Sequence, residues 1–202
     1  MIRYAISCLV ILAVIAASGS YFFRDYWEHR YDDLVVRHAR IYRIDAKLVW
    51  SIIYEETYFR AWMIGDADEA GLMQVTPLVA RDWARETGFK EFERETAENV
   101  VEFLQDPERN IRVGCWYFEK LRETYRGRLA ETAMTLAAYN AGPSRVEEWT
   151  RGTNTDELSE AEFISRIQIP STRAYVSSIL ERYRNEVELR PTPSAEPTPR
   201  EE

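Results

Sequence analysis

Glu56 is the side chain in this sequence best placed for acid–base chemistry. It ends an apolar stretch in which Val49, Ile52 and Ile53 share one helical face with it. A carboxyl on a buried face tends to keep its proton, because desolvation disfavours the charged form. A carboxyl protonated near neutral pH can give its proton to the leaving oxygen of a glycosidic bond. We therefore predict that Glu56 is a general acid acting on a glycan.

The neighbouring Glu55 is a weaker candidate for this role. At the same helical offsets it is flanked by Leu48, Ser51 and Ile52, a more polar set. The sequence therefore favours Glu56 over Glu55 as the acid.

A second catalytic carboxylate is not evident. Glycosidases normally use two, and the nearest further acids are Asp66, Asp68 and Glu69 in a glycine-bounded loop. A solvated loop is the simpler interpretation of these three. One carboxyl suffices if the substrate supplies the remaining reacting groups.

Length and composition fit one domain with a real core. The chain has 202 residues, 46% of them hydrophobic, and a net charge of −8. Without its two ends about 165 residues remain, enough for a single domain. The acidic balance argues against nucleic-acid binding. Cys8 and Cys115 form no disulfide framework or zinc motif. We also expect the reaction to need no metal and no organic cofactor.

The N-terminal segment is predicted to direct export. Residues 4–23 carry no charge, and Arg3 precedes them. This length suits a membrane span, whereas the small residues at 16–20 also suit signal-peptide cleavage. The aromatic residues at 21–23 favour an uncleaved anchor. Segment 1–24 is thus a signal-anchor, or alternatively a signal peptide of a secreted protein, and the domain faces the periplasm or outside in the cell envelope.

Helix signals account for most of the remaining chain. The sequence predicts a stalk or leading helix at 25–38, one catalytic domain at 39–189 and a disordered Pro-rich tail at 190–202. Strand alternation is not convincing anywhere. We therefore expect an all-α domain of about seven helices. The expected helices span residues 27–42, 46–58, 76–86, 106–125, 131–139, 143–149 and 172–189.

Five short motifs follow one another in a fixed order. They are Glu56-Thr57, Gly71-Leu72-Met73-Gln74-Val75, Asn110-Ile111 with Gly114, Ala138-Tyr139-Asn140-Ala141-Gly142, and Ile169-Pro170 followed by Thr172-Arg173-Ala174-Tyr175-Val176. Together they resemble the soluble-lytic-transglycosylase (SLT) catalytic domain family of the lysozyme-like superfamily. The resemblance covers roughly residues 39–184.

This resemblance implies a reaction on peptidoglycan glycan strands. The family cleaves the β-1,4 bond between N-acetylmuramic acid and N-acetylglucosamine without water, leaving a 1,6-anhydro ring. The family's catalytic glutamate matches Glu56, which would act first as acid and then as base. The residues that match its substrate-binding positions are Gln74, Met73, Tyr139, Asn140 and Tyr175.

The sequence also departs from the family pattern. Thr57 replaces the usual serine, Arg60 stands where Asn-Pro is common, and Ser171 replaces a frequent glutamate. Two other interpretations stay open. One is a hydrolase like goose-type lysozyme, with Asp66 or Asp68 as a second carboxylate, and the other is a non-catalytic, membrane-tethered wall-binding scaffold.

Overall fold

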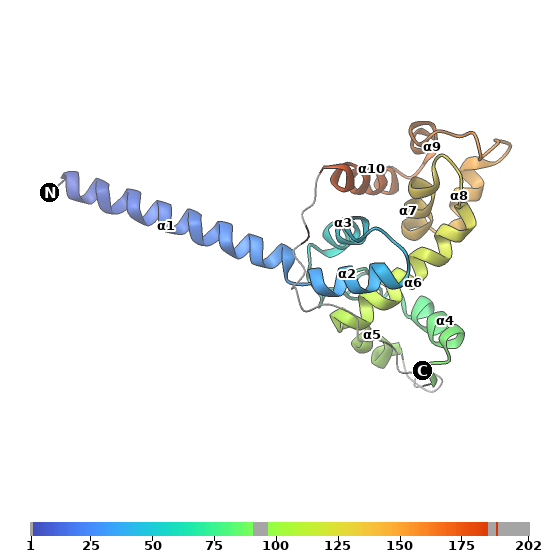
Figure 1. Ribbon diagram of the computed structural model, residues 1–202, viewed down its shortest axis with the longest axis horizontal. Coiled ribbons are helices and arrows are strands. Elements are labelled where there is room, and N and C mark those ends of the chain that lie inside the picture. The colour runs from blue at the N-terminus through green and yellow to red at the C-terminus, as the bar shows by residue number, and fades with distance from the viewer. Residues whose placement is uncertain (1, 91–96, 186–188, 190–202) are drawn as a thin grey trace.

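The structure is a computed structural model that describes residues 2–90, 97–185 and 189, with side chains from residue 11 onward except Ala97. Every regular element in these residues is a helix, so the all-α prediction is confirmed. The helices are α1 (Ile2–His29), α2 (Asp32–Ile41), α3 (Ala46–Thr57), α4 (Pro77–Thr87), α5 (Ala97–Gln105), α6 (Pro107–Tyr125), α7 (Glu131–Ala141), α8 (Pro143–Thr150), α9 (Glu160–Arg166) and α10 (Pro170–Arg184). Figure 1 shows α1 extending away from the other helices.

Local capping chemistry sets several helix starts. Asp45 accepts a hydrogen bond from the Lys47 amide at the start of α3. Thr76 and Asp106 cap α4 and α6 in the same way, each followed by proline in the first turn. These side chains satisfy amides that have no partner inside the helix. The predicted starts of all three helices are confirmed.

The expected number of helices is too low. Beyond α1, nine helices lie within the described residues, because α5 and α9 were not expected. Helix α9 starts with a reciprocal capping box between Ser159 and Glu162, a signal present in the sequence. The last helix begins at Pro170 and ends at Arg184, rather than spanning 172–189.

The segment expected to be a stalk contributes to the packed domain. Helix α2 packs against α3 and α6. Val35 is fully buried and Ala39 nearly so. The globular core therefore includes residues from the predicted 25–38 segment.

Helix α6 occupies the centre of the domain and touches α2, α4, α5 and α7. Helices α3 and α10 pack on one another, and α10 also packs on α7. The largest fully buried side chains include Trp83, Phe118 and Phe163. This core fixes α3, α7 and α10, the three helices that carry most of the predicted site.

In the part of the chain that the structure describes, no helix is both long and apolar enough to cross a membrane. The side chains of residues 1–10 of the predicted anchor, and the whole Pro-rich tail 190–202, lie outside the described residues.

Candidate active site

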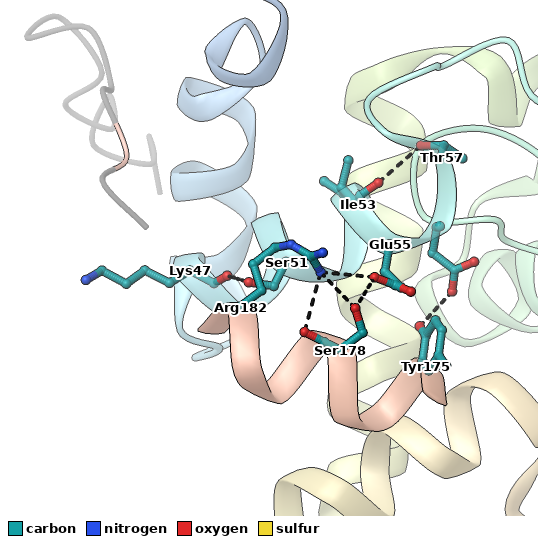
Figure 2. A network of polar contacts seen from close by, with 9 residues as sticks. Lys47, Ser51, Ile53, Glu55, Thr57, Tyr175, Ser178 and Arg182 are labelled. Atoms are coloured by element: carbon teal, nitrogen blue, oxygen red, sulfur yellow. Dashed lines mark hydrogen bonds and ion pairs between the residues drawn. The ribbon is translucent and has the colours of Figure 1, made fainter. Parts of the chain in front are cut away.

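Glu56 lies in the last turn of α3, where it faces α10. The helix ends at Thr57, and Tyr58 follows in the left-handed conformation. The Tyr175 hydroxyl, on α10, donates a hydrogen bond of 2.6 Å to Glu56 Oε1. Figure 2 shows Tyr175 pointing from α10 toward the end of α3. Two residues 119 positions apart are thus in direct contact.

Burial raises the pKa of Glu56 from 4.5 to about 7. The Tyr175 hydrogen bond opposes this rise, while the nearby charges of Glu55 and Glu69 add to it. Near neutral pH both protonation states of Glu56 are therefore populated. A group in this condition can donate a proton and later accept one.

The neighbouring Glu55 is held by a hydroxyl and a guanidinium group of α10. Its Oε2 accepts a hydrogen bond of 2.7 Å from the Ser178 hydroxyl and lies 3.0 Å from Arg182 Nη1. Figure 2 shows Glu55, Ser178 and Arg182 meeting between α3 and α10. Adjacent glutamates thus have different surroundings, one paired with a cation and one held by a tyrosine.

Asn110 holds the loop that contains Gly71 and Met73. Its Oδ1 accepts a hydrogen bond of 2.7 Å from the Met73 amide. Its Nδ2 donates to the carbonyls of Ala70 and Leu104, at 2.7 and 2.8 Å. A Cβ on Gly71 would lie only 2.1 Å from the Leu104 carbonyl oxygen, and the backbone there has φ +75°. Glycine is therefore needed for this close approach.

Thr57 ties the same loop to α3. Its hydroxyl lies 3.1 Å from the Leu72 carbonyl oxygen and 3.3 Å from that of Ile53. The threonine that replaces the usual serine keeps the hydroxyl that makes these bonds.

The predicted loop residues Met73 and Gln74 have different surroundings. Met73 is fully buried, and a Cβ on Gly114 would lie 2.5 Å from its sulfur. The Met73 side chain is therefore part of the core, and only its backbone is left to contact a substrate. Gln74 is half-buried with φ +47°, and its amide donates to the Gly71 carbonyl at 2.9 Å. Its side chain closes the turn.

Tyr139 and Asn140 lie at the end of α7. The Tyr139 hydroxyl donates a hydrogen bond of 2.7 Å to the Met73 carbonyl. Burial, helped by the charge of Glu56, raises the pKa of Tyr139 well above its usual value. Asn140 is exposed, and its Oδ1 accepts a hydrogen bond of 2.7 Å from the Thr172 hydroxyl. Asn140 thus links α7 to α10.

The structure brings Glu56 and Tyr175 into contact and places Tyr139 against the loop of Met73 and Gln74. Sequence reasoning assigned no role to Asn110, although it noted the residue in a motif. It also missed the partners of Glu55 on α10. The four-residue spacing of Ser178 and Arg182 indicates that they share one helix face, but not that this face meets Glu55.

Two residues that depart from the family pattern, Arg60 and Ser171, lie on the surface. Arg60 is exposed, and its Nε donates to the Thr57 carbonyl at 2.8 Å. Ser171 is exposed in the first turn of α10. Among the described residues, no three His, Cys, Asp or Glu side chains are grouped to hold a metal ion.

Comparison with known proteins identifies one family. The family model described as "Transglycosylase SLT domain" matches residues 33–161. The soluble lytic murein transglycosylase of Salmonella typhimurium is 26% identical over 161 residues, which are 76% of this chain and 23% of that protein. The membrane-bound lytic murein transglycosylase C of Edwardsiella ictaluri is 30% identical over 58% of this chain and 33% of its own.

Solved structures show the same fold. The inactive mutant of the lytic transglycosylase Slt from Pseudomonas aeruginosa aligns with a TM-score of 0.62 and 26% identity, over 74% of this chain and 22% of that chain. A 70-kDa soluble lytic transglycosylase in complex with bulgecin A aligns with a TM-score of 0.64 and 25% identity, over 76% and 23%. The chain thus spans between about a fifth and a third of these proteins' lengths.

Proposed function

Because this chain belongs to the transglycosylase SLT domain family, we propose that it is a peptidoglycan lytic transglycosylase. It would cleave the β-1,4 bond between N-acetylmuramic acid and N-acetylglucosamine. The observation that carries the proposal is the half-buried Glu56, with its pKa raised to about 7 and its carboxyl bonded to Tyr175. The relatives' names, which call them lytic murein transglycosylases, support the substrate class.

In the proposed mechanism Glu56 serves twice. The protonated carboxyl first gives its proton to the glycosidic oxygen, and the bond to the muramoyl C1 breaks. The neighbouring N-acetyl group stabilises the cationic centre. Glu56, now a carboxylate, then takes the proton of the C6 hydroxyl as that oxygen bonds to C1. The products are a 1,6-anhydro muramoyl end and a free N-acetylglucosamine hydroxyl, and no water is consumed.

The other predicted site residues would hold this geometry. Tyr175 donates to the carboxylate form of Glu56 and so stabilises it between the two steps. Tyr139 fixes the carbonyl of Met73, beside Gln74 in the same loop. We propose Gln74, Tyr139 and Asn140 as sugar contacts, and Met73 as a contact through its backbone, since its side chain is buried.

Product analysis tests the reaction class. Digestion of purified sacculi should release muropeptides lighter by one water molecule than the products of a hydrolase, and without a reducing muramoyl end. Mass spectrometry before and after borohydride reduction separates the two. Reducible ends would instead show a lysozyme-like hydrolase. No release at all by folded protein would favour a wall-binding scaffold.

We also propose that residues 4–23 anchor the domain in the membrane, with the domain on the envelope side. The support is a run of 20 residues without charge, together with exposed apolar side chains such as Ile11, Leu12 and Ile15 on α1. The full chain expressed in bacteria should remain in the membrane fraction in high salt and dissolve in detergent. A chain that appears at shortened mass in the soluble periplasmic fraction would show a cleaved signal peptide instead.

A further inference from the structure

The backbone directly after α3, the helix that carries Glu56, is strained. Tyr58 has φ 49° and ψ 49°, and Phe59 has φ 59°. Side chains with a Cβ enter the left-handed region at a cost of about 1–2 kcal/mol per residue. Such conformations persist when the surrounding structure holds them, and here the two residues come immediately after the turn that carries Glu56.

Side chains at the end of α1 and directly after it hold both of these residues. The Trp27 indole donates a hydrogen bond of 2.9 Å to the Tyr58 carbonyl. The Arg30 guanidinium donates to the Phe59 carbonyl and also lies over the Trp27 ring, 3.4 Å from its centroid. We name Trp27, Glu28 and Arg30 the brace.

Glu28 completes the brace through both its side chain and its backbone. Its Oε1 accepts a hydrogen bond of 3.0 Å from the Tyr58 hydroxyl. Its backbone carbonyl accepts one of 3.1 Å from the Trp50 indole on α3. Trp50 in turn packs against Phe59, with ring centroids 5.0 Å apart. The end of α1 is therefore hydrogen-bonded both to α3 itself and to the turn that follows it.

We propose that the brace positions Glu56. The catalytic turn of α3 is held from two sides, by Tyr175 of α10 and by the brace through Tyr58 and Phe59. Trp27 and Arg30 precede residues 33–161, which match the SLT domain, so this support lies outside the matched segment. The inference rests on the proposed function, since it assigns a positioning role in that reaction.

Losing the brace would allow the left-handed turn to relax. The last turn of α3 would then shift relative to α10, and the Glu56 carboxyl would move with respect to Tyr175 and the substrate. Small displacements of a reacting group reduce turnover strongly, by up to about a hundredfold for a 1 Å change. Substrate affinity depends on the other proposed sugar contacts and would change little.

The packing around Trp27 makes a mild test possible. An open surface pocket of about 210 Å³ is lined by Phe23, Arg24, Trp27 and Tyr58, so the indole is not enclosed in the close-packed core. Trp27→Phe removes the hydrogen-bond donor and keeps an aromatic ring. Tyr26→Phe is the matched control, because it removes a polar atom from the preceding residue, whose side chain is exposed.

The test measures kcat and KM of the full chain, kept in detergent, with purified sacculi as substrate. Trp27→Phe should lower kcat about tenfold with KM unchanged, whereas Tyr26→Phe should match the wild type. The falling limb of the pH profile of kcat should also move to lower pH, since the displaced Glu56 carboxyl becomes hydrated. Circular dichroism at the assay temperature corrects kcat for the folded fraction.

Two results would overturn the inference. One is a wild-type kcat and pH profile for Trp27→Phe. The other is a loss of activity that disappears once kcat is expressed per folded molecule, since that would show a purely structural role. A wild-type enzyme that releases no muropeptides would refute the proposed function itself, and the positioning role with it.

Discussion

Replacing Glu56 with glutamine should lower the rate of muropeptide release by about a thousandfold. The amide of glutamine has nearly the same shape, but it cannot give a proton to the leaving oxygen or take one from the attacking hydroxyl. General acid–base groups typically contribute a factor of about 10²–10⁴. The measurement is the initial rate of soluble muropeptide release from purified sacculi, with circular dichroism to show that the variant is folded.

Glu55→Gln is the matched control on the preceding residue. Its carboxylate contacts Ser178 and Arg182, and both members of the ion pair are partly exposed. Pairs of this kind contribute about 0.2–1 kcal/mol. The control should therefore keep most of the activity and lose a little stability. A large loss in Glu55→Gln together with an active Glu56→Gln would reverse the assignment of the acid.

Glu56→Gln should also change how the free energy of unfolding depends on pH. Burial raises the pKa of Glu56 to about 7 in the folded protein, above the 4.5 of an ordinary glutamate. The folded state therefore favours the neutral form, and the carboxylate destabilises it as pH rises from about 4.5 through about 7. Glu56→Gln should unfold with the same free energy as the wild type at pH 4 and with a larger one at pH 8. Parallel curves across this range would contradict the raised pKa.

Asn110→Ala should lower the free energy of unfolding by about 3–4 kcal/mol. The substitution leaves the Met73 amide and the carbonyls of Ala70 and Leu104 without their partner in a buried site. An unsatisfied buried polar group costs about 1–3 kcal/mol, and relaxation makes the sum smaller than three separate losses. Urea denaturation measures the effect.

Asn154→Ala is the comparison for this stability effect. Asn154 is exposed, and its side chain accepts one hydrogen bond of 3.2 Å, from the Asp156 amide. A change below about 0.5 kcal/mol is expected, as for most surface positions. Equal urea midpoints for the Asn110 and Asn154 variants would show that Asn110 does not stabilise the loop.

Features with a local cause could be predicted from the sequence. Asp45, Thr76 and Asp106 cap helices within three residues of themselves, so the starts of α3, α4 and α6 follow from short stretches of sequence. Helix α9 is short and does not repeat an apolar face over several turns, and periodicity alone does not detect such an element.

Features that depend on tertiary contacts could not be predicted in the same way. The partners Glu56 and Tyr175 are 119 residues apart, and only the order of family motifs suggested that both belong to one site. The burial of Met73 depends on the close approach of Gly114 from α6, which the sequence around Met73 does not indicate. The role of Asn110 likewise depends on three backbone groups that the fold brings together.

The continuity of α1 has a consequence for where this protein acts. Helix α1 runs without a break from Ile2 to His29, and its end is bonded to α3. If residues 4–23 lie in the bilayer, only residues 24–29 separate the lipid from the domain, a rise of about 9 Å at 1.5 Å per residue. A stiff spacer of this length is not a flexible linker, so the catalytic domain would stay at the membrane surface. Newly made strands close to the bilayer would then be in reach, whereas distant layers of the wall would not.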